Sequence, residues 1–261
     1  MRTTELGRTG VHIPVIGMGT SEYLGGSRPL RSGLEHGATL IDTAESYGTE
    51  MQVGPATEDR RDRAFIATKV SAERFARDDL LAAVGESLAR LRTDTIDLYQ
   101  LHWPSSTVPI EQTMATMDEL VDRGTVRFIG VCNFSVEQLE AAQAASRHPV
   151  VSNQVPYSLI DRGIEDELLP WCRDHGVTVI AYSPLARDLE TLEAGLAPGV
   201  LEQVAREVGA TKAQVALAWC IRSPGVVAIP KSRHVERVIE NCGAAEVSLS
   251  PEQIARLEQP P

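Results

Sequence analysis

Four side chains of different chemistry follow three apolar segments of this 261-residue chain, each close to the point where a segment ends. Asp42 ends residues 38–42 and Tyr47 follows shortly after it, Lys69 follows residues 64–68, and His102 follows residues 96–101. An ammonium group beside a phenol stabilises the phenolate and lowers the pKa of the phenol, and a carboxylate pairs with the ammonium. Such a phenol transfers protons near neutral pH, so the four residues together predict acid–base chemistry.

Each of these residues also has an ordinary structural role when it is taken alone. An Asp-Thr-Ala sequence after a strand is often a turn or a helix cap, and a lone lysine is most often exposed. A lone histidine is as often a hydrogen-bonded core residue, and a lone tyrosine usually packs in a core. The catalytic hypothesis therefore depends on whether the fold brings the four side chains to one place.

Eight short apolar segments alternate with segments of helical period, and these are the elements that must position the four residues. The apolar segments have the composition of strands buried on both faces, and they cover residues 15–19, 38–42, 64–68, 96–101, 126–131, 150–153, 177–181 and 225–229. Apolar residues recur with helical spacing in residues 78–91, 110–121, 136–145, 164–172, 200–208 and 213–221. Ser135, Thr211 and Ser250 are suitable N-caps, the last for a final helix over residues 251–257.

Eight strands alternating with helices in about 250 residues predict an α/β fold, a closed (β/α)8 TIM barrel. A doubly wound open sheet is the competing architecture, but it usually has a glycine-rich phosphate loop after its first strand, and residues 17–19 lack the third glycine. No linker, low-complexity stretch or block of charge divides the chain, so we predict a single domain over residues 1–261. The carboxyl ends of barrel strands share one face, which would bring the four candidate residues together.

Composition excludes several classes of function. The chain has 25 Lys and Arg against 36 Asp and Glu, a net charge of −11, which argues against a surface for nucleic acid. It shows no signal sequence and no run near the roughly 20 apolar residues that cross a membrane. Its four cysteines are scattered without a CxxC pair, which favours free thiols over a zinc site or a disulfide framework. We therefore expect a cytoplasmic protein without a metal.

The motifs around these residues resemble those of the aldo-keto reductase family over nearly the whole length of the chain. The matching segments occur in the family's order at residues 40–48, 66–69, 98–104, 129–134, 153–154, 182–185 and 229–232, followed by Arg237, Glu240 and Asn241. Each fragment is weak evidence alone, but their joint occurrence at the correct spacing is specific. The short loops are most similar to those of bacterial members that reduce dicarbonyls and keto-sugars.

The resemblance implies a role for each of the four residues in reducing a carbonyl with a nicotinamide hydride. Negative charge grows on the carbonyl oxygen as hydride arrives, so an acid must protonate that oxygen. By resemblance, Tyr47 is the general acid, Lys69 lowers its pKa, and Asp42 anchors Lys69. His102 would hold the substrate oxygen and assist proton transfer, and Tyr47 would act as the base when an alcohol is oxidised.

The resemblance also implies a site for NADPH. Asn133 and Gln154 match positions that bind the nicotinamide carboxamide, Tyr182 matches the aromatic residue on which the ring stacks, and Ser183 and Leu185 match the pyrophosphate contacts. Lys231, Ser232 and Arg237 match the pocket for the adenosine 2′-phosphate, with Glu240 and Asn241 near the adenine, and a helix starting near Arg233 would add backbone donors. Two cations and a hydroxyl suit a dianionic phosphate, which favours NADPH over NADH.

The sequence departs from the family's pattern in the regions that shape the substrate pocket. Cys132 stands where many members have serine, and the frequent aromatic residue after the first strand is missing, with Tyr23 the nearest replacement. Residues 21–37 and 50–62 look shortened, and the loops after His102 and Leu185 look brief. We expect an open pocket for a small-molecule carbonyl compound, with Trp103 and Tyr23 against the substrate.

A regulatory barrel that binds NADP(H) with little turnover is the alternative function. Some relatives of the fold act as auxiliary subunits, and a sensor could lose any of the four residues. The intact set of Asp42, Tyr47, Lys69 and His102 favours the enzyme. Many relatives are monomers, and a monomer is the expectation that the resemblance supports.

Overall fold

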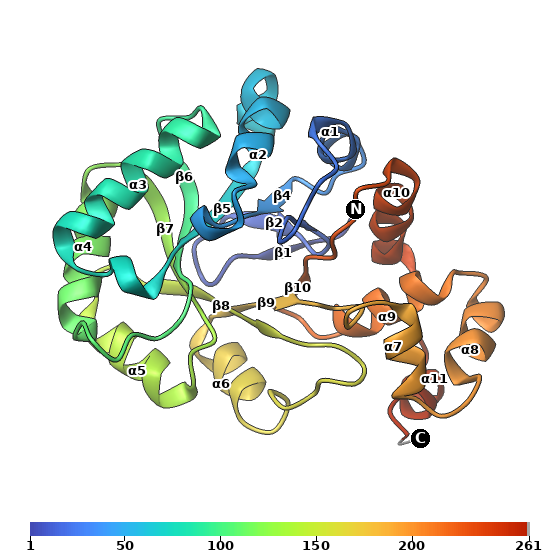
Figure 1. Ribbon diagram of the computed structural model, residues 1–261. Coiled ribbons are helices and arrows are strands. Elements are labelled where there is room, and N and C mark those ends of the chain that lie inside the picture. The colour runs from blue at the N-terminus through green and yellow to red at the C-terminus, as the bar shows by residue number, and fades with distance from the viewer. Residues whose placement is uncertain (260–261) are drawn as a thin grey trace.

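A curled sheet of eight parallel strands forms the centre of the computed structural model, which describes residues 1–259 (Figure 1). Its strands are β3 (Met18–Gly19), β4 (Leu40–Asp42), β5 (Phe65–Val70), β6 (Ile96–Leu101), β7 (Val126–Cys132), β8 (Val150–Pro156), β9 (Thr178–Tyr182) and β10 (Val226–Ala228). They pair in chain order from β3 to β10. The eight predicted apolar segments are therefore the eight strands.

The two edges of the sheet meet and close the barrel. Ile16 forms a parallel bridge with Ala228, the amide of Gly17 donates to the carbonyl of Ala228 at 2.9 Å, and the amide of Ala228 donates to the carbonyl of Val15 at 2.9 Å. The amide of Gly19 also donates across this junction, to the carbonyl of Pro230 at 3.1 Å. The predicted (β/α)8 barrel is confirmed.

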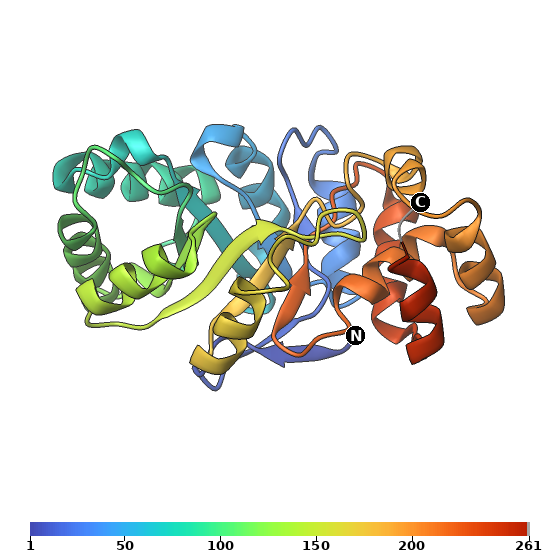
Figure 2. The same ribbon diagram turned by 90° about the horizontal axis from the view of Figure 1, so that it is seen from below.

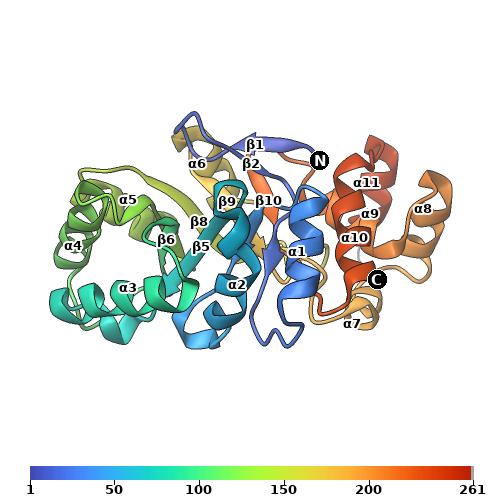
Figure 3. The ribbon, with the colours of Figure 1, turned by 90° about the horizontal axis from the view of Figure 1, so that it is seen from above.

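Helices surround the sheet on its outer face (Figure 1). They are α1 (Ser27–Glu35), α2 (Glu50–Thr57), α3 (Arg77–Leu91), α4 (Ile110–Asp122), α5 (Val136–Ala145), α6 (Leu168–His175), α7 (Leu189–Ala194), α8 (Val200–Val208), α9 (Lys212–Cys220), α10 (Val235–Gly243) and α11 (Pro251–Leu257). Short 3-10 turns cover Glu45–Tyr47, Glu58–Arg63, Ala72–Arg74 and Ala244–Glu246. Helix α10 lies beside α1, so the last helices complete the ring begun by the first (Figure 3).

The predicted caps of three helices are confirmed. Ser135, Thr211 and Ser250 each accept a hydrogen bond from the backbone amide three residues later, and the side-chain oxygen of the glutamine at that position accepts one from the amide of the cap residue. These reciprocal bonds satisfy amides that a helix leaves free at its start.

One element was not predicted, and two local predictions differ from the structure. An antiparallel hairpin of β1 (Thr3–Glu5) and β2 (His12–Pro14) lies across one end of the barrel, where Leu6 and Ile13 pack on inward-facing strand residues (Figures 2 and 3). The segment after Leu185 is not a brief loop, because it contains α7. Helix α6 begins at Leu168 rather than near residue 164.

In the part of the chain that the structure describes, no helix is long and apolar enough to cross a membrane.

Candidate functional site

The carboxyl ends of β4 and β5 bring a buried ion pair into the barrel. The Nζ atom of Lys69 donates to Oδ1 of Asp42 at 2.5 Å and to the carbonyl of Thr43 at 2.9 Å. The side chains of Lys69 and Asp42 are 0% and 3% exposed. A charge so far from water is tolerated only when it is paired and hydrogen-bonded, and here both conditions are met.

Tyr47 and His102 complete the cluster above this pair. Tyr47 lies in the 3-10 turn after β4, and its hydroxyl is 3.2 Å from Nε2 of His102, at the end of β6. Lys69 Nζ lies 4.9 Å from the centroid of the Tyr47 ring, and the Tyr47 and His102 rings meet edge to face at 5.4 Å. The structure thus brings together the four residues that the sequence singled out for acid–base chemistry.

Burial and charge act in opposite directions on these groups. Desolvation and, to a smaller extent, the charge of Lys69 lower the pKa of His102 to about 4, so the imidazole is neutral at pH 7. Desolvation raises the pKa of Tyr47 above its ordinary value, and Lys69 lowers it only in part. Lys69 therefore lowers the pKa of Tyr47, as the resemblance implied, but burial outweighs this effect.

Two amides support Asp42 from below. Nε2 of Gln154 donates to Oδ2 of Asp42 at 2.7 Å, and Nε2 of Gln100 donates to the same oxygen at 3.2 Å. This contact orients the Gln154 amide and leaves its Oε1 as the acceptor for another group. Gln100 was not among the predicted site residues, although it lies two residues before His102 and the side chains of alternate residues share one face of a strand.

A carboxylate on each side of Tyr47 fixes the segment that carries it. Glu45 accepts from the amide of Ser71 at 2.8 Å and from Arg74 at 3.0 Å, and its side chain is 7% exposed. Both partners lie just after β5, which carries Lys69. Glu45 therefore ties the turn of Tyr47 to the strand of its lysine.

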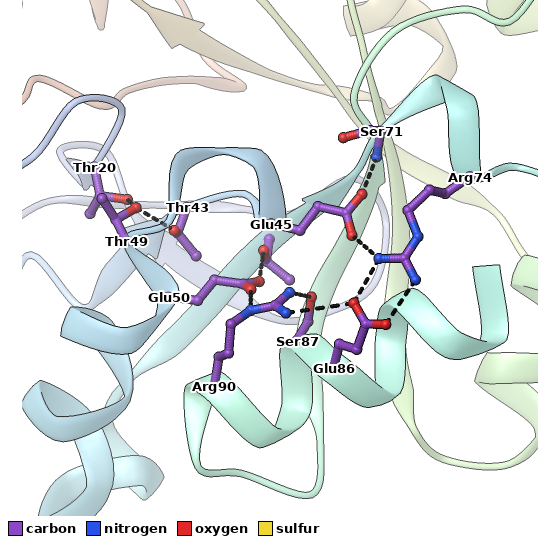
Figure 4. Close-up of polar contacts among 11 residues, drawn as sticks. Thr20, Thr43, Glu45, Thr49, Glu50, Ser71, Arg74, Glu86, Ser87 and Arg90 are labelled. Atoms are coloured by element: carbon purple, nitrogen blue, oxygen red, sulfur yellow. Dashed lines mark hydrogen bonds and ion pairs between the residues drawn. The ribbon is translucent and has the colours of Figure 1, made fainter. Parts of the chain in front are cut away.

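Glu50, at the start of α2, makes the second attachment. It is 0% exposed, accepts from the Thr68 hydroxyl at 2.6 Å, and pairs with Nε of Arg90 at 2.7 Å. Glu86 bonds Arg74 at 2.8 Å and lies 3.7 Å from Arg90, so the two attachments form one chain of alternating charges (Figure 4). This network could not be predicted, because its charged side chains come from segments far apart in the sequence.

The expected nicotinamide residues lie at the ends of β7, β8 and β9. The Tyr182 hydroxyl donates to Oδ1 of Asn133 at 3.1 Å, and Nδ2 of Asn133 donates to the carbonyl of His102 at 3.2 Å. Asn133 and Ser183 have φ of 63° and 49°, in the left-handed region that side chains rarely adopt. Strained backbone of this kind concentrates at binding and catalytic sites. Leu185 is partly buried against the core.

The expected phosphate and adenine residues lie between β10 and α10. Arg237 is exposed, and in residues 1–259 no carboxylate pairs with it, whereas Lys231 is 3.6 Å from Glu22. Ser232 and Asn241 line one hollow, and Glu240 lies beside Asn241 on α10. Helix α10 starts at Val235 with His234 as its N-cap, two residues later than expected.

A cavity of about 500 Å³ opens beside His102, between the turn after β5 and the loop after β6. Trp103, expected to contact the substrate, lines this cavity and is 52% exposed. The same expectation for Tyr23 is wrong, because Tyr23 is 2% exposed and its hydroxyl donates to the carbonyl of Gly26 at 2.9 Å. The neighbouring Leu24 is a large apolar side chain that this loop exposes to solvent, at 80%.

Cys132 is a buried thiol at the end of β7, and burial raises its pKa well above the ordinary value. It therefore stays protonated and has little nucleophilic character. Within residues 1–259, no group of three or more His, Cys, Asp and Glu is placed to hold a metal ion.

The side chains at the strand ends and at the start of α10 fit a nicotinamide dinucleotide. Gln154 presents a free carbonyl to a carboxamide, Tyr182 offers an aromatic ring at the barrel mouth, and Arg237 is an unpaired cation within the described chain. Each group has the chemistry that one part of such a cofactor requires.

Comparison with known proteins agrees with this geometry. A model described as the aldo/keto reductase family matches residues 27–260. Methylglyoxal reductase YeaE of Escherichia coli (strain K12) is 38% identical over 261 aligned positions, which cover 95% of this chain and 91% of that protein.

Solved structures are similar over almost the whole chain. The thermostable aldo-keto reductase Tm1743, in complex with the inhibitor epalrestat, has a TM-score of 0.91 and 43% identity, with 99% of each chain covered. An aldo-keto reductase from Klebsiella pneumoniae in complex with NADPH has a TM-score of 0.90 and 38% identity, covering 98% of this chain and 94% of that one.

Proposed function

Because the chain belongs to the aldo/keto reductase family, we propose that it reduces aldehydes and ketones to alcohols with NADPH as the hydride donor. The similarity to a methylglyoxal reductase and to an NADPH-bound aldo-keto reductase supports this proposal. The observation on which the proposal rests is the buried ion pair of Lys69 and Asp42 beneath the hydroxyl of Tyr47. Such a pair has a large desolvation cost and contributes little to stability, so a catalytic role explains it better than a structural one.

NADPH, when bound, supplies the hydride, and the residues at the strand ends hold it. Gln154 and Asn133 orient the carboxamide, and Tyr182 supports the nicotinamide ring. The remaining contacts come from Ser183 and Leu185 at the pyrophosphate, Lys231, Ser232 and Arg237 at the 2′-phosphate, and Glu240 and Asn241 at the adenine. Arginine meets a phosphate with a fork of donors, and this favours NADPH over NADH.

Tyr47 donates the proton. Its hydroxyl is polarised by Lys69 from below and hydrogen-bonded to His102 at 3.2 Å. The neutral His102 donates from Nε2 to the substrate oxygen and so places that oxygen against the Tyr47 hydroxyl. The proton moves from Tyr47 to the oxygen as negative charge develops there, and the charge of Lys69 stabilises the phenolate that remains. Asp42 keeps Lys69 charged and fixed.

The test is the substitution Tyr47→Phe, which removes the proton donor and leaves the cofactor contacts in place. We expect NADPH binding, followed by quenching of protein fluorescence, to be retained. Turnover of a panel of neutral carbonyl compounds, including methylglyoxal and a benzaldehyde, should fall by about 10²- to 10⁴-fold. Normal turnover in the variant would refute the role of Tyr47.

The same measurements distinguish the regulatory alternative. A wild-type protein that binds NADPH tightly but consumes it with no member of the panel would favour an NADP(H)-binding regulatory barrel. The intact cluster of Asp42, Tyr47, Lys69 and His102 favours the enzyme.

A further inference from the structure

The cavity beside His102 has a wall of hydroxyl groups and a single charged side chain. The lining residues include five that carry a hydroxyl and one that carries a carboxylate, namely Ser46, Ser71, Ser105, Ser106, Thr107 and Glu73. A volume of about 500 Å³ suits a small ligand. The lining includes neither lysine nor arginine.

The four residues of the candidate catalytic cluster carry no net charge between them. The charges of Asp42 and Lys69 cancel within their ion pair. His102 is neutral because its pKa is about 4, and Tyr47 is neutral because burial raises its pKa. Glu73 therefore sets the sign of the charge that an incoming substrate meets.

Nothing in the described chain neutralises Glu73. No lysine, arginine or histidine of residues 1–259 forms an ion pair with it. The adjacent Arg74 is turned away, because it bonds Glu45 at 3.0 Å and Glu86 at 2.8 Å. The carboxylate is close enough to the centre to act on His102, whose pKa it raises against the larger effect of burial.

We propose that Glu73 is a specificity-determining residue, which makes the site selective for uncharged, hydroxyl-bearing carbonyl compounds over carboxylated or phosphorylated ones. A carboxylate or phosphate on the substrate would meet a like charge and no cation in the lining. Two like charges about 6 to 8 Å apart in a half-exposed cavity change binding by about 3- to 10-fold. Hydroxyl groups of a substrate instead find hydrogen-bonding partners in the serine-rich wall. This inference rests on the proposed function.

The test compares two aldehydes of nearly the same shape, methyl 4-formylbenzoate and 4-formylbenzoate, in wild type and in Glu73→Gln. The measured quantity is the ratio of kcat/KM for the ester to that for the carboxylate, followed by NADPH consumption. We expect the wild type to favour the ester and the ratio to fall by about 3- to 10-fold in the variant. Added salt should lower the ratio in the wild type and have less effect in the variant.

Asp62→Asn is the matched control, since it removes the same charge before β5, at the opposite end of the strand from Glu73. Its ratio should equal that of the wild type. An equal ratio in all three proteins, with the ester still reduced, would overturn the role of Glu73 and leave the proposed function intact. Failure of the wild type to reduce either aldehyde or any neutral carbonyl of the panel would instead contradict the proposed function itself.

Discussion

Removing Arg90 tests how strongly the charge network holds the segment that carries Tyr47. In Arg90→Met, Glu50 keeps its hydrogen bond from Thr68 but loses the guanidinium, which lies 2.7 Å from its other oxygen. The Glu50 side chain is 0% exposed, so water cannot replace the lost partner without rearrangement. The variant therefore leaves a buried carboxylate at the start of α2 without its cation.

The magnitude follows from the burial of the two partners. Removing one partner of a buried ion pair costs about 3–5 kcal/mol. The Arg90 side chain is 28% exposed, so solvent reaches one side of the pair and the lower end of that range applies. We expect a loss of about 3 kcal/mol in the free energy of unfolding, which lowers the Tm of a protein of this size by about 6–12 °C.

Urea unfolding followed by circular dichroism measures this loss, and two further variants complete the assay. Arg92→Met removes an arginine whose pair with Glu58 is 54% and 56% exposed, and it should cost about 1 kcal/mol or less. The double variant Glu50→Leu/Arg90→Met removes both buried charges. It should be more stable than Arg90→Met alone, because no unpaired charge remains.

Two results would refute the reasoning. Equal stability losses in Arg90→Met and Arg92→Met would mean that burial of Glu50 does not amplify the loss of its partner. A double variant less stable than Arg90→Met would mean that the arginine acts by packing alone and not by compensating the carboxylate.

Two other predictions follow from the site. Arg237→Ala should weaken NADPH binding by about 10- to 100-fold in a fluorescence titration, because a charge-assisted contact to the 2′-phosphate is lost; an equal loss for NADH would contradict that contact. The folded pKa of His102, about 4, lies below the ordinary value of 6.5, so the unfolded chain binds more protons between these values and stability falls as the pH falls through that window. His102→Gln should remove this part of the pH dependence when urea unfolding is compared at about pH 7 and about pH 4.5, and an unchanged dependence would show that other groups cause it.

The sequence was sufficient to predict the eight strands, because each is buried on both faces and therefore forms a short apolar segment. The caps Ser135, Thr211 and Ser250 were predictable for a similar local reason, because each capping hydrogen bond joins residues only three positions apart. Helix α7 has only six residues, and its one buried side chain is Leu192. A segment that short is stabilised by its packing and has too little helical period to predict.

Part of the candidate site was likewise predictable from the sequence, and part of it depended on the folded structure. The residue types and their places at strand ends predicted that Asp42, Tyr47, Lys69 and His102 converge, because parallel strands of a barrel end on one face. Which residue of the first loop faces solvent, Leu24 rather than Tyr23, depends on a bond within that loop that no periodicity indicates.

The order of the elements and the groups available for chemistry could be predicted from the sequence, since both follow from residue type and local spacing. The charge state of those groups and the contacts that hold them depend on how the folded chain packs around them. Burial, which raises the pKa of Tyr47 against the effect of Lys69, is a property of everything packed around the phenol. The attachment of Glu50 to Arg90 and the cavity lined by Glu73 and His102 likewise arise from segments that meet only when the barrel closes.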